Sequence, residues 1–221
     1  MDKRSDPSGS LFELENSYEA NLICGLDEVG RAPLAGPVTA ACVVIPKESR
    51  SCDFWTDVTD SKLVSRQKRE RLYELICENS FYGLGWVGPR EIERMNIHVA
   101  SLVAMQRAYQ EMCGLLKATP AMALADGRFA PDLGIECRTI VKGDLKCKSI
   151  AAASIIAKRC RDAYMGELHQ QFPVYNWTNN VGYPTKDHLE ALTNAGPCPF
   201  HRRTFARVRE FFEIKKQASL L

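Results

Sequence analysis

The 221-residue sequence lacks several features that would assign it to a specialised class of protein. No apolar run approaches the roughly 20 residues that a membrane-spanning helix needs, and no segment is of low complexity. The first 20 residues are polar and contain no apolar stretch of the kind found in secretion signals. We therefore expect a cytoplasmic globular protein that does not enter a membrane, in which residues 1–20 form a loosely ordered tail.

No two of the nine cysteines form a Cys-x-x-Cys pair, so a structural zinc site is not expected. The odd count favours reduced thiols, and Cys24, Cys42 and Cys77 stand inside apolar runs that suggest burial. Reduced, buried thiols are typical of a reducing compartment. No histidine near these residues indicates a cysteine nucleophile.

Charge is distributed unevenly along the chain. Residues 1–137 carry 15 Lys or Arg and 20 Asp or Glu, whereas residues 138–221 carry 14 and 7. An acidic part could hold metal ions and a basic part could hold a polyanion, although a chance imbalance of surface charge would look the same.

The spacing of apolar residues predicts a mixed α/β sheet with helices packed on it, because early strands follow short connections and later strands alternate with helices. Strands are predicted at residues 21–27, 38–45, 80–87, 121–126 and 137–144. Helices are predicted at residues 65–79, 97–116, 149–172, 185–196 and 205–217. The weakest boundary is the loop at residues 173–184, which is rich in aromatic and asparagine residues.

Three aspartates, Asp27, Asp126 and Asp144, each stand at or just past the end of a predicted apolar strand, and Glu28 adjoins the first. If these strands are neighbours, the four carboxylates converge at the strand ends, where α/β sheets gather ligand groups. Such a cluster requires a counter-charge, and all-oxygen ligands suit Mg²⁺ or Mn²⁺ rather than zinc. Each aspartate alone is more typical of a turn at a strand end; the repetition favours a metal site.

Three further residues are candidates for contacts to a polyanion. Arg31 is either a counter-ion of the acids or a contact to phosphate and sugar. Lys62 precedes a helix, where a phosphate contact and a plain turn are about equally plausible. Tyr183 stands in a stiff Gly-Tyr-Pro loop, where its ring could stack on a base or sugar or pack beneath the loop. Together these residues indicate metal-assisted phosphoryl chemistry on a polyanion.

Seven motifs in a fixed order carry a resemblance to a known family. They are GLDEVGRAPLAGPV (25–38), TDSKLVS (59–65), NIHVASLVAMQRA (96–108), ADG (125–127), VKGDLKCKSIAAASIIAKRCRD (141–162), GYPTKDHLEAL (182–192) and HRRTF (201–205). Over about residues 22–212 the sequence resembles ribonuclease HII. The resemblance implies a ribonuclease H-like fold, with a mixed five-stranded sheet flanked by helices and a C-terminal helical segment.

The resemblance also implies an activity and a set of partners. The expected reactions are cleavage of RNA within RNA–DNA hybrids and incision of duplex DNA 5′ of a single embedded ribonucleotide, leaving 3′-hydroxyl and 5′-phosphate ends. We expect a catalytic domain at residues 21–172, a C-terminal substrate-binding loop and helices at residues 173–221, and a monomer. A replication clamp is a conceivable partner, but the C-terminus contains no clear clamp-binding box.

The family's motifs assign roles to individual residues by resemblance. Two Mn²⁺ or Mg²⁺ ions would be held by Asp27, Glu28, Asp126 and Asp144. The ribose 2′-hydroxyl would be read by the backbone of Gly30, Arg31 and Ala32, the junction by Tyr183, and a phosphate by Lys62.

Two positions depart from the family pattern. Ala32 replaces a glycine. If the position needs a positive φ, alanine costs roughly 1–2 kcal/mol, and if the backbone must approach the ribose, the added methyl group crowds it. If φ is ordinary, the replacement changes nothing. Asn180 and Val181 replace His-Lys, removing a cation that Lys186 or the arginines at 202 and 203 could replace. A hybrid-binding protein with weak turnover and a hybrid nuclease without junction preference are therefore the alternatives.

Overall fold

The computed structural model describes residues 11–18 and 22–218, and the chain divides into two compact units. The first unit comprises Met1–Val29, Thr39–Trp86 and Leu102–Arg159. The second comprises Gly30–Val38, Val87–Ser101 and Cys160–Leu221. Each unit is assembled from separate stretches of sequence, and the predicted division at residue 173 stays a prediction.

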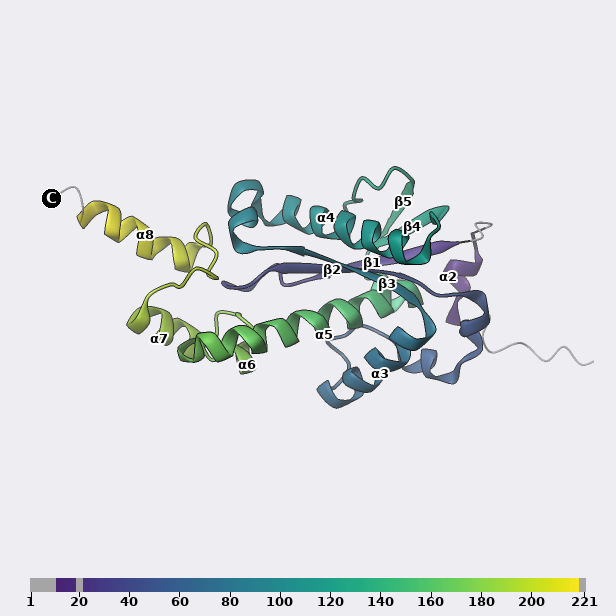
Figure 1. Cartoon of the computed structure of the whole chain (residues 1–221), viewed down its shortest axis with the longest axis horizontal. Helices are drawn as coiled ribbons and strands as arrows, with labels where there is room; N and C mark the ends of the chain where they lie inside the picture. Colours follow the sequence, from purple (N-terminus) through teal and green to yellow (C-terminus); the bar gives the residue numbers. More distant parts are fainter. Residues whose placement is uncertain (1–10, 19–21, 219–221) are drawn as a thin grey trace, which may run out of the picture. The chain divides into compact units, whose positions relative to one another are not determined.

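A mixed five-stranded sheet forms the centre of the first unit, as the sequence predicts (Figure 1). Its strands are β1 (Ile23–Val29), β2 (Val38–Val44), β3 (Phe81–Val87), β4 (Met122–Asp126) and β5 (Glu136–Ile140), in the order β3-β2-β1-β4-β5. β1 pairs antiparallel with β2 and parallel with β4, and β4 pairs parallel with β5. Each strand overlaps a predicted one.

The five predicted helices are also present. They are α3 (Arg66–Asn79), α4 (Pro89–Leu116), α5 (Lys148–Gln171), α7 (Lys186–Ala195) and α8 (Ala206–Ala218). Shorter elements are α2 (Glu13–Asn16), α6 (Trp177–Asn180) and the 3₁₀ turns η1 (Lys47–Ser51), η2 (Asp53–Asp57), η3 (Gly143–Leu145) and η4 (Pro173–Tyr175). No helix among the described residues is long and apolar enough to cross a membrane.

Side-chain caps set where these helices begin. The Ser65 hydroxyl accepts from the Lys68 N–H at the start of α3, and Thr185 accepts from the His188 N–H at the start of α7. α4 starts earlier than predicted, at Pro89, but it is interrupted at Asn96, where φ is 66°. The Asn96 side chain accepts from the N–H groups of His98 and Val99, at 2.9 and 3.1 Å. A new helical segment therefore begins at residue 97, as the sequence predicts.

The first half of α5 packs closely on the sheet because a glycine of β1 faces it. A Cβ added to Gly25 in β1 would lie 2.3 Å from the Ser149 carbonyl carbon, so only glycine lets β1 and α5 approach this closely. Residues 150–157 of α5 are almost all apolar and buried. α4 and α5 lie on opposite faces of the sheet (Figure 1).

Part of the segment expected to be a loosely ordered tail packs against the first unit. Phe12 is fully buried, and Glu15 of α2 is 3% exposed. One Glu15 carboxylate oxygen accepts from the Ser149 N–H at 2.8 Å, which caps the start of α5. Residues 1–10 and 19–20 of that segment lie outside the described residues.

Candidate active site

The strand order brings the predicted acids together in the first unit. Leu26 of β1 pairs with Ala125 of β4, so Asp27 and Asp126 follow at the same edge of two parallel neighbours. Asp144 was predicted within the last strand, but β5 ends at Ile140, and the aspartate lies in η3. β5 is also a largely exposed edge strand rather than a buried apolar one. Lys142, in the left-handed conformation, turns the chain out of the sheet just before η3.

The carboxylates at this end of the strands are near enough to repel one another. Burial raises the pKa of Asp27 well above its usual value, and this side chain is 7% exposed. Three neighbouring carboxylates add to that rise: Glu28, Asp126 and Asp144. Burial also raises the pKa of Asp144, followed by the charges of Asp60 and Asp126. The charges of neighbouring carboxylates therefore disfavour ionisation of Asp27 and of Asp144.

Backbone hydrogen bonds hold two of these acids in place. The Glu28 N–H donates to Asp27 Oδ1 at 2.7 Å, and the Gly143 N–H donates to Asp126 Oδ1 at 2.7 Å. The second bond joins the end of β4 to η3, which carries Asp144. Glycine at 143 leaves room for the Ile150 side chain, because a Cβ there would lie 2.6 Å from Ile150 Cδ1.

The cluster fits a divalent cation by donor type and by charge. Its side chains are all carboxylates, and their mutual repulsion is the kind that a hard dication relieves. Within the part of the chain that the structure describes, no three acidic, histidine or cysteine side chains are close enough to hold an ion as they stand.

Lys62 lies near this cluster, and Asp60 is an acid that the sequence reasoning passed over. The positive charge of Lys62 lowers the pKa of Asp144, while Asp60 raises it. The Lys62 N–H donates to Asp60 Oδ1 at 2.9 Å, which fixes the turn before α3. The motif TDSK contained the signal, since Asp60 stands only two residues before the lysine.

The Gly30–Ala32 segment belongs to the second unit. Gly30 has a φ of 89°, and a Cβ there would lie 2.2 Å from Arg161 Nε. Only glycine fits this position, for both reasons. Arg31 and Ala32 are exposed.

The φ angle of Ala32 removes one of the sequence-based concerns. Five described non-glycine residues have positive φ: Asn96, Lys117, Lys142, Asn176 and Val181. Ala32 is not among them, so the strain argument for this position is wrong. Strain instead falls on the other departure, because Val181 has φ 42° and ψ 32°, a rare conformation for a β-branched residue.

The C-terminal arginines do not both supply a surface cation. Arg202 is fully buried, and its guanidinium binds backbone carbonyls, so it cannot replace the cation lost at position 181. Arg203 and Lys186 are exposed, and Lys186 pairs with Glu190 at 3.7 Å. Tyr183 is half-buried, and its carbonyl oxygen lies 2.8 Å from His188 Nδ1. The histidines at 188 and 201, which look dispersed in the sequence, are in contact.

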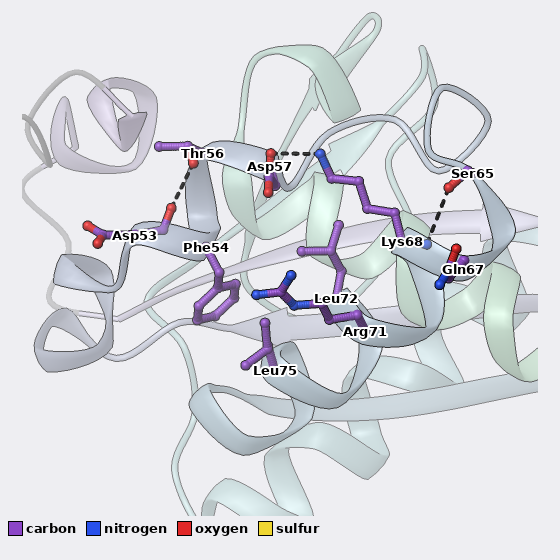
Figure 2. Close-up of a pocket in the computed structure, with 10 residues that line it drawn as sticks. All are labelled: Asp53, Phe54, Thr56, Asp57, Ser65, Gln67, Lys68, Arg71, Leu72 and Leu75. Atoms are coloured by element: carbon purple, nitrogen blue, oxygen red, sulfur yellow. Dashed lines mark hydrogen bonds and ion pairs between the residues drawn. The ribbon is translucent and has the colours of Figure 1, made fainter.

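Two cavities in the first unit bear differently on this site. A cavity of about 220 Å³ is lined by Asp144 and by Lys146 and Lys148, among others. A larger one, of about 680 Å³, lies between η2 and α3, where Asp57 and Lys68 form an ion pair of 2.7 Å (Figure 2). None of the four clustered acids lines the larger cavity, so volume alone does not mark the site.

Comparison with known proteins decides the family. Residues 24–208 match the family model described as ribonuclease HII. The chain belongs to the ribonuclease HII family. A ribonuclease HII of Caldanaerobacter subterraneus is 48% identical over 186 residues, covering 84% of this chain and 74% of the relative.

Solved structures agree with this assignment. The ribonuclease HII of Archaeoglobus fulgidus, solved in complex with PCNA, has a TM-score of 0.67 and 25% identity, covering 84% of this chain and 95% of the other. Bst-RNase HIII in complex with Mn²⁺ has a TM-score of 0.71 at 18% identity, covering 89% and 70%, and shows a shared fold. The protein is therefore a ribonuclease H, a nuclease that acts on RNA–DNA hybrids.

Proposed function

We propose that this ribonuclease H also incises duplex DNA on the 5′ side of a single embedded ribonucleotide, leaving 3′-hydroxyl and 5′-phosphate ends. The observation that carries the catalytic part is the cluster of four carboxylates at one edge of the sheet, with a raised pKa at Asp27 and Asp144. Phosphodiester hydrolysis needs an activated water and stabilisation of a leaving oxygen, and carboxylate-bound dications supply both.

The proposed metal ligands are the four acids of this cluster: Asp27, Glu28, Asp126 and Asp144. Two Mg²⁺ or Mn²⁺ ions suit their charge and oxygen donors, and the Mn²⁺ complex of the structurally similar Bst-RNase HIII is consistent with that choice. The protein's own contribution is to hold Asp27 and Asp126 on adjacent strands and to fix Asp126 through the Gly143 N–H. Lys62, whose positive charge lowers the pKa of Asp144, is the proposed phosphate contact.

The proposed ribonucleotide reader consists of the backbone of Gly30, Arg31 and Ala32, with Tyr183 at the junction. The positive φ of Gly30 and the exposure of the next two residues support this role, because they present backbone groups on the surface. The 2′-hydroxyl is the group that distinguishes RNA from DNA, and a backbone N–H can bind it. The ordinary φ of Ala32 leaves its N–H able to serve.

A panel of three labelled substrates tests the proposal: a DNA duplex with one ribonucleotide, a long RNA–DNA hybrid and an all-DNA duplex. Each is incubated with Mg²⁺ or Mn²⁺, with Asp126→Asn as the inactive control. We expect one incision 5′ of the ribonucleotide, which the variant abolishes. The all-DNA duplex should not be cleaved.

Other results would select the alternatives. Cleavage of the long hybrid alone would indicate a hybrid nuclease without junction preference. Tight binding of both ribonucleotide-containing substrates without cleavage would indicate a binding protein with weak turnover. Cleavage activity that persists after treatment with a chelator would contradict the proposed metal-dependent mechanism.

A further inference from the structure

Two arginines in the second unit are fully buried, and the guanidinium group of each donates hydrogen bonds to backbone carbonyls. Arg202 donates three hydrogen bonds, to the oxygens of Gly36 (2.9 Å), Arg31 (2.9 Å) and Gly30 (2.5 Å). Arg161 also donates three, to the oxygens of Pro37 (2.9 Å), Val181 (3.0 Å) and Ala35 (3.1 Å). Together they bind the loop at residues 30–37 along most of its length.

This arrangement is electrostatically costly. Burial lowers the pKa of Arg161 to about 10, and burial together with the charge of Arg161 lowers that of Arg202 to about 9. Both side chains nevertheless stay charged near neutral pH. Apolar residues of similar volume often serve a protein core as well as or better than buried charges. Filling space in the core therefore does not explain why two guanidinium groups are buried next to each other.

The hydrogen bonds of Arg202 determine which way the loop's N–H groups point. No peptide bond among the described residues is cis, so the carbonyl of one residue and the N–H of the next point in opposite directions. Because the carbonyls of Gly30 and Arg31 point inward at Arg202, the N–H groups of Arg31 and Ala32 point away from it. Both of these residues lie on the exposed side of the loop.

The same arginines are connected to the loop that carries Tyr183. Arg161 binds the Val181 carbonyl, and the Leu34 N–H donates to the Gly182 oxygen at 2.8 Å. The phenol of Tyr183 is near enough to act electrostatically on both guanidinium groups. The two segments proposed to read the substrate are therefore held on one buried scaffold.

We propose that Arg202 is a positioning residue for ribonucleotide recognition: by binding the carbonyls of Gly30 and Arg31, it aims the N–H groups of Arg31 and Ala32 at the substrate ribose. Arg161 fixes the far end of the same loop. This inference rests on the proposed function, in which that loop reads the 2′-hydroxyl. Arg202 does not touch the substrate.

The test compares Arg202→Lys with Arg209→Lys, an exposed arginine on α8 that pairs with Glu213. Lysine keeps the charge but lacks the planar fork that binds several carbonyls in fixed directions. For each protein, kcat and KM are measured on the single-ribonucleotide duplex and on the long hybrid, and Tm is measured with and without Mn²⁺. A single ribonucleotide offers one 2′-hydroxyl in one register, whereas a long hybrid offers many.

We expect Arg202→Lys to lower kcat/KM at least about tenfold more on the single-ribonucleotide duplex than on the hybrid, with the Mn²⁺-dependent rise in Tm retained. Arg209→Lys should match the wild type. A second variant, Ala32→Pro, removes one of the aimed N–H groups without touching the core, and it should show the same selective loss even if Arg202→Lys folds poorly.

Two results would overturn the inference. One is an unchanged ratio of the two kcat/KM values in both variants. The other is an equal loss of kcat/KM on both substrates in Arg202→Lys, in proportion to its loss of Tm, while Ala32→Pro retains the wild-type kcat/KM values. That result would show that Arg202 is purely structural. Failure of the wild type to incise the single-ribonucleotide duplex would instead overturn the proposed function and, with it, the basis of this inference.

Discussion

The Nε2 atoms of His188 and His201 lie 3.1 Å apart, and both rings are buried. His188 Nδ1 faces the Tyr183 carbonyl at 2.8 Å, so that nitrogen carries the proton, and its Nε2 accepts from Trp177 Nε1 at 3.2 Å. His201 Nε2 must then donate to His188, while its Nδ1 accepts from the Cys198 N–H at 3.1 Å. Every ring nitrogen has one fixed role, and all four roles require both rings to be neutral.

Acid should therefore destabilise the second unit. Burial lowers the pKa of His188, and burial followed by the charge of His188 lowers the pKa of His201 to about 3. Between that value and the usual 6.5, only the unfolded chain binds a proton at His201, so stability falls as pH falls through this window, and the lowered pKa of His188 acts in the same direction. The His201 contribution to the free energy of unfolding should drop by roughly 2 kcal/mol between pH 7.5 and 5.0.

Urea unfolding at the two pH values measures this loss. Asn at position 201 can still accept from the Cys198 N–H but does not ionise, so His201→Asn should be less stable at pH 7.5 and lose less on acidification. Equal losses in the variant and the wild type would contradict the role of this histidine pair.

Asp126→Asn should separate activity from stability. The variant removes a charge that raises the pKa of both Asp27 and Asp144, while its amide oxygen can still accept from the Gly143 N–H. Without metal, we expect the free energy of unfolding at pH 7.5 to rise by roughly 0.5–2 kcal/mol. The cleavage rate should fall on the order of 1,000-fold, which corresponds to a loss of about 4 kcal/mol of transition-state stabilisation.

The measurements for this variant are thermal unfolding with and without Mn²⁺ and the hybrid cleavage rate. Asp132→Asn, an exposed aspartate in the same unit, is the control and should alter neither. Retention of the full Mn²⁺-dependent rise in Tm in Asp126→Asn would show that this carboxylate does not bind the ion.

Ala32→Gly should change recognition little, because Ala32 does not occupy the left-handed region that favours glycine. Glycine adds conformational freedom to the unfolded chain, so we expect a loss of roughly 0.5–1 kcal/mol in stability. The kcat/KM on the single-ribonucleotide duplex should stay within about threefold of the wild type, which corresponds to less than about 0.7 kcal/mol of transition-state stabilisation. A gain of tenfold or more would show instead that the alanine methyl obstructs the ribose.

Val181→Gly should stabilise the protein relative to Val181→Ala. Both variants lose the two valine methyl groups that pack against the cluster containing Met165 and Trp177, and both keep the carbonyl that Arg161 binds. Only glycine adopts φ 42° without a steric penalty, so the glycine variant should be more stable than the alanine variant by roughly 1–2 kcal/mol. Chemical denaturation of the two variants gives this difference directly, and a more stable alanine variant would exclude strain at this position.

Local pattern was enough to predict the elements from the sequence. Alternating and helical apolar periodicity located five strands and five helices. The family followed from seven ordered motifs, now supported by the match over residues 24–208. The candidate acids were found because each follows a strand, although β5 ends four residues before Asp144.

Only the tertiary structure decided which of these residues meet. The strand order β3-β2-β1-β4-β5 depends on long-range pairing, which no local pattern encodes, and it is this order that places Asp27 beside Asp126. The roles of Arg161 and Arg202 stayed hidden, because an arginine in a sequence gives no sign of whether it faces water or a ring of carbonyls. Helical spacing did contain one clue, since Arg161 falls on the same face as the buried Ile150 and Ala157. Backbone torsions depend on the packing of the whole loop and could not be predicted from residue types alone. They show that Val181, and not Ala32, has a positive φ.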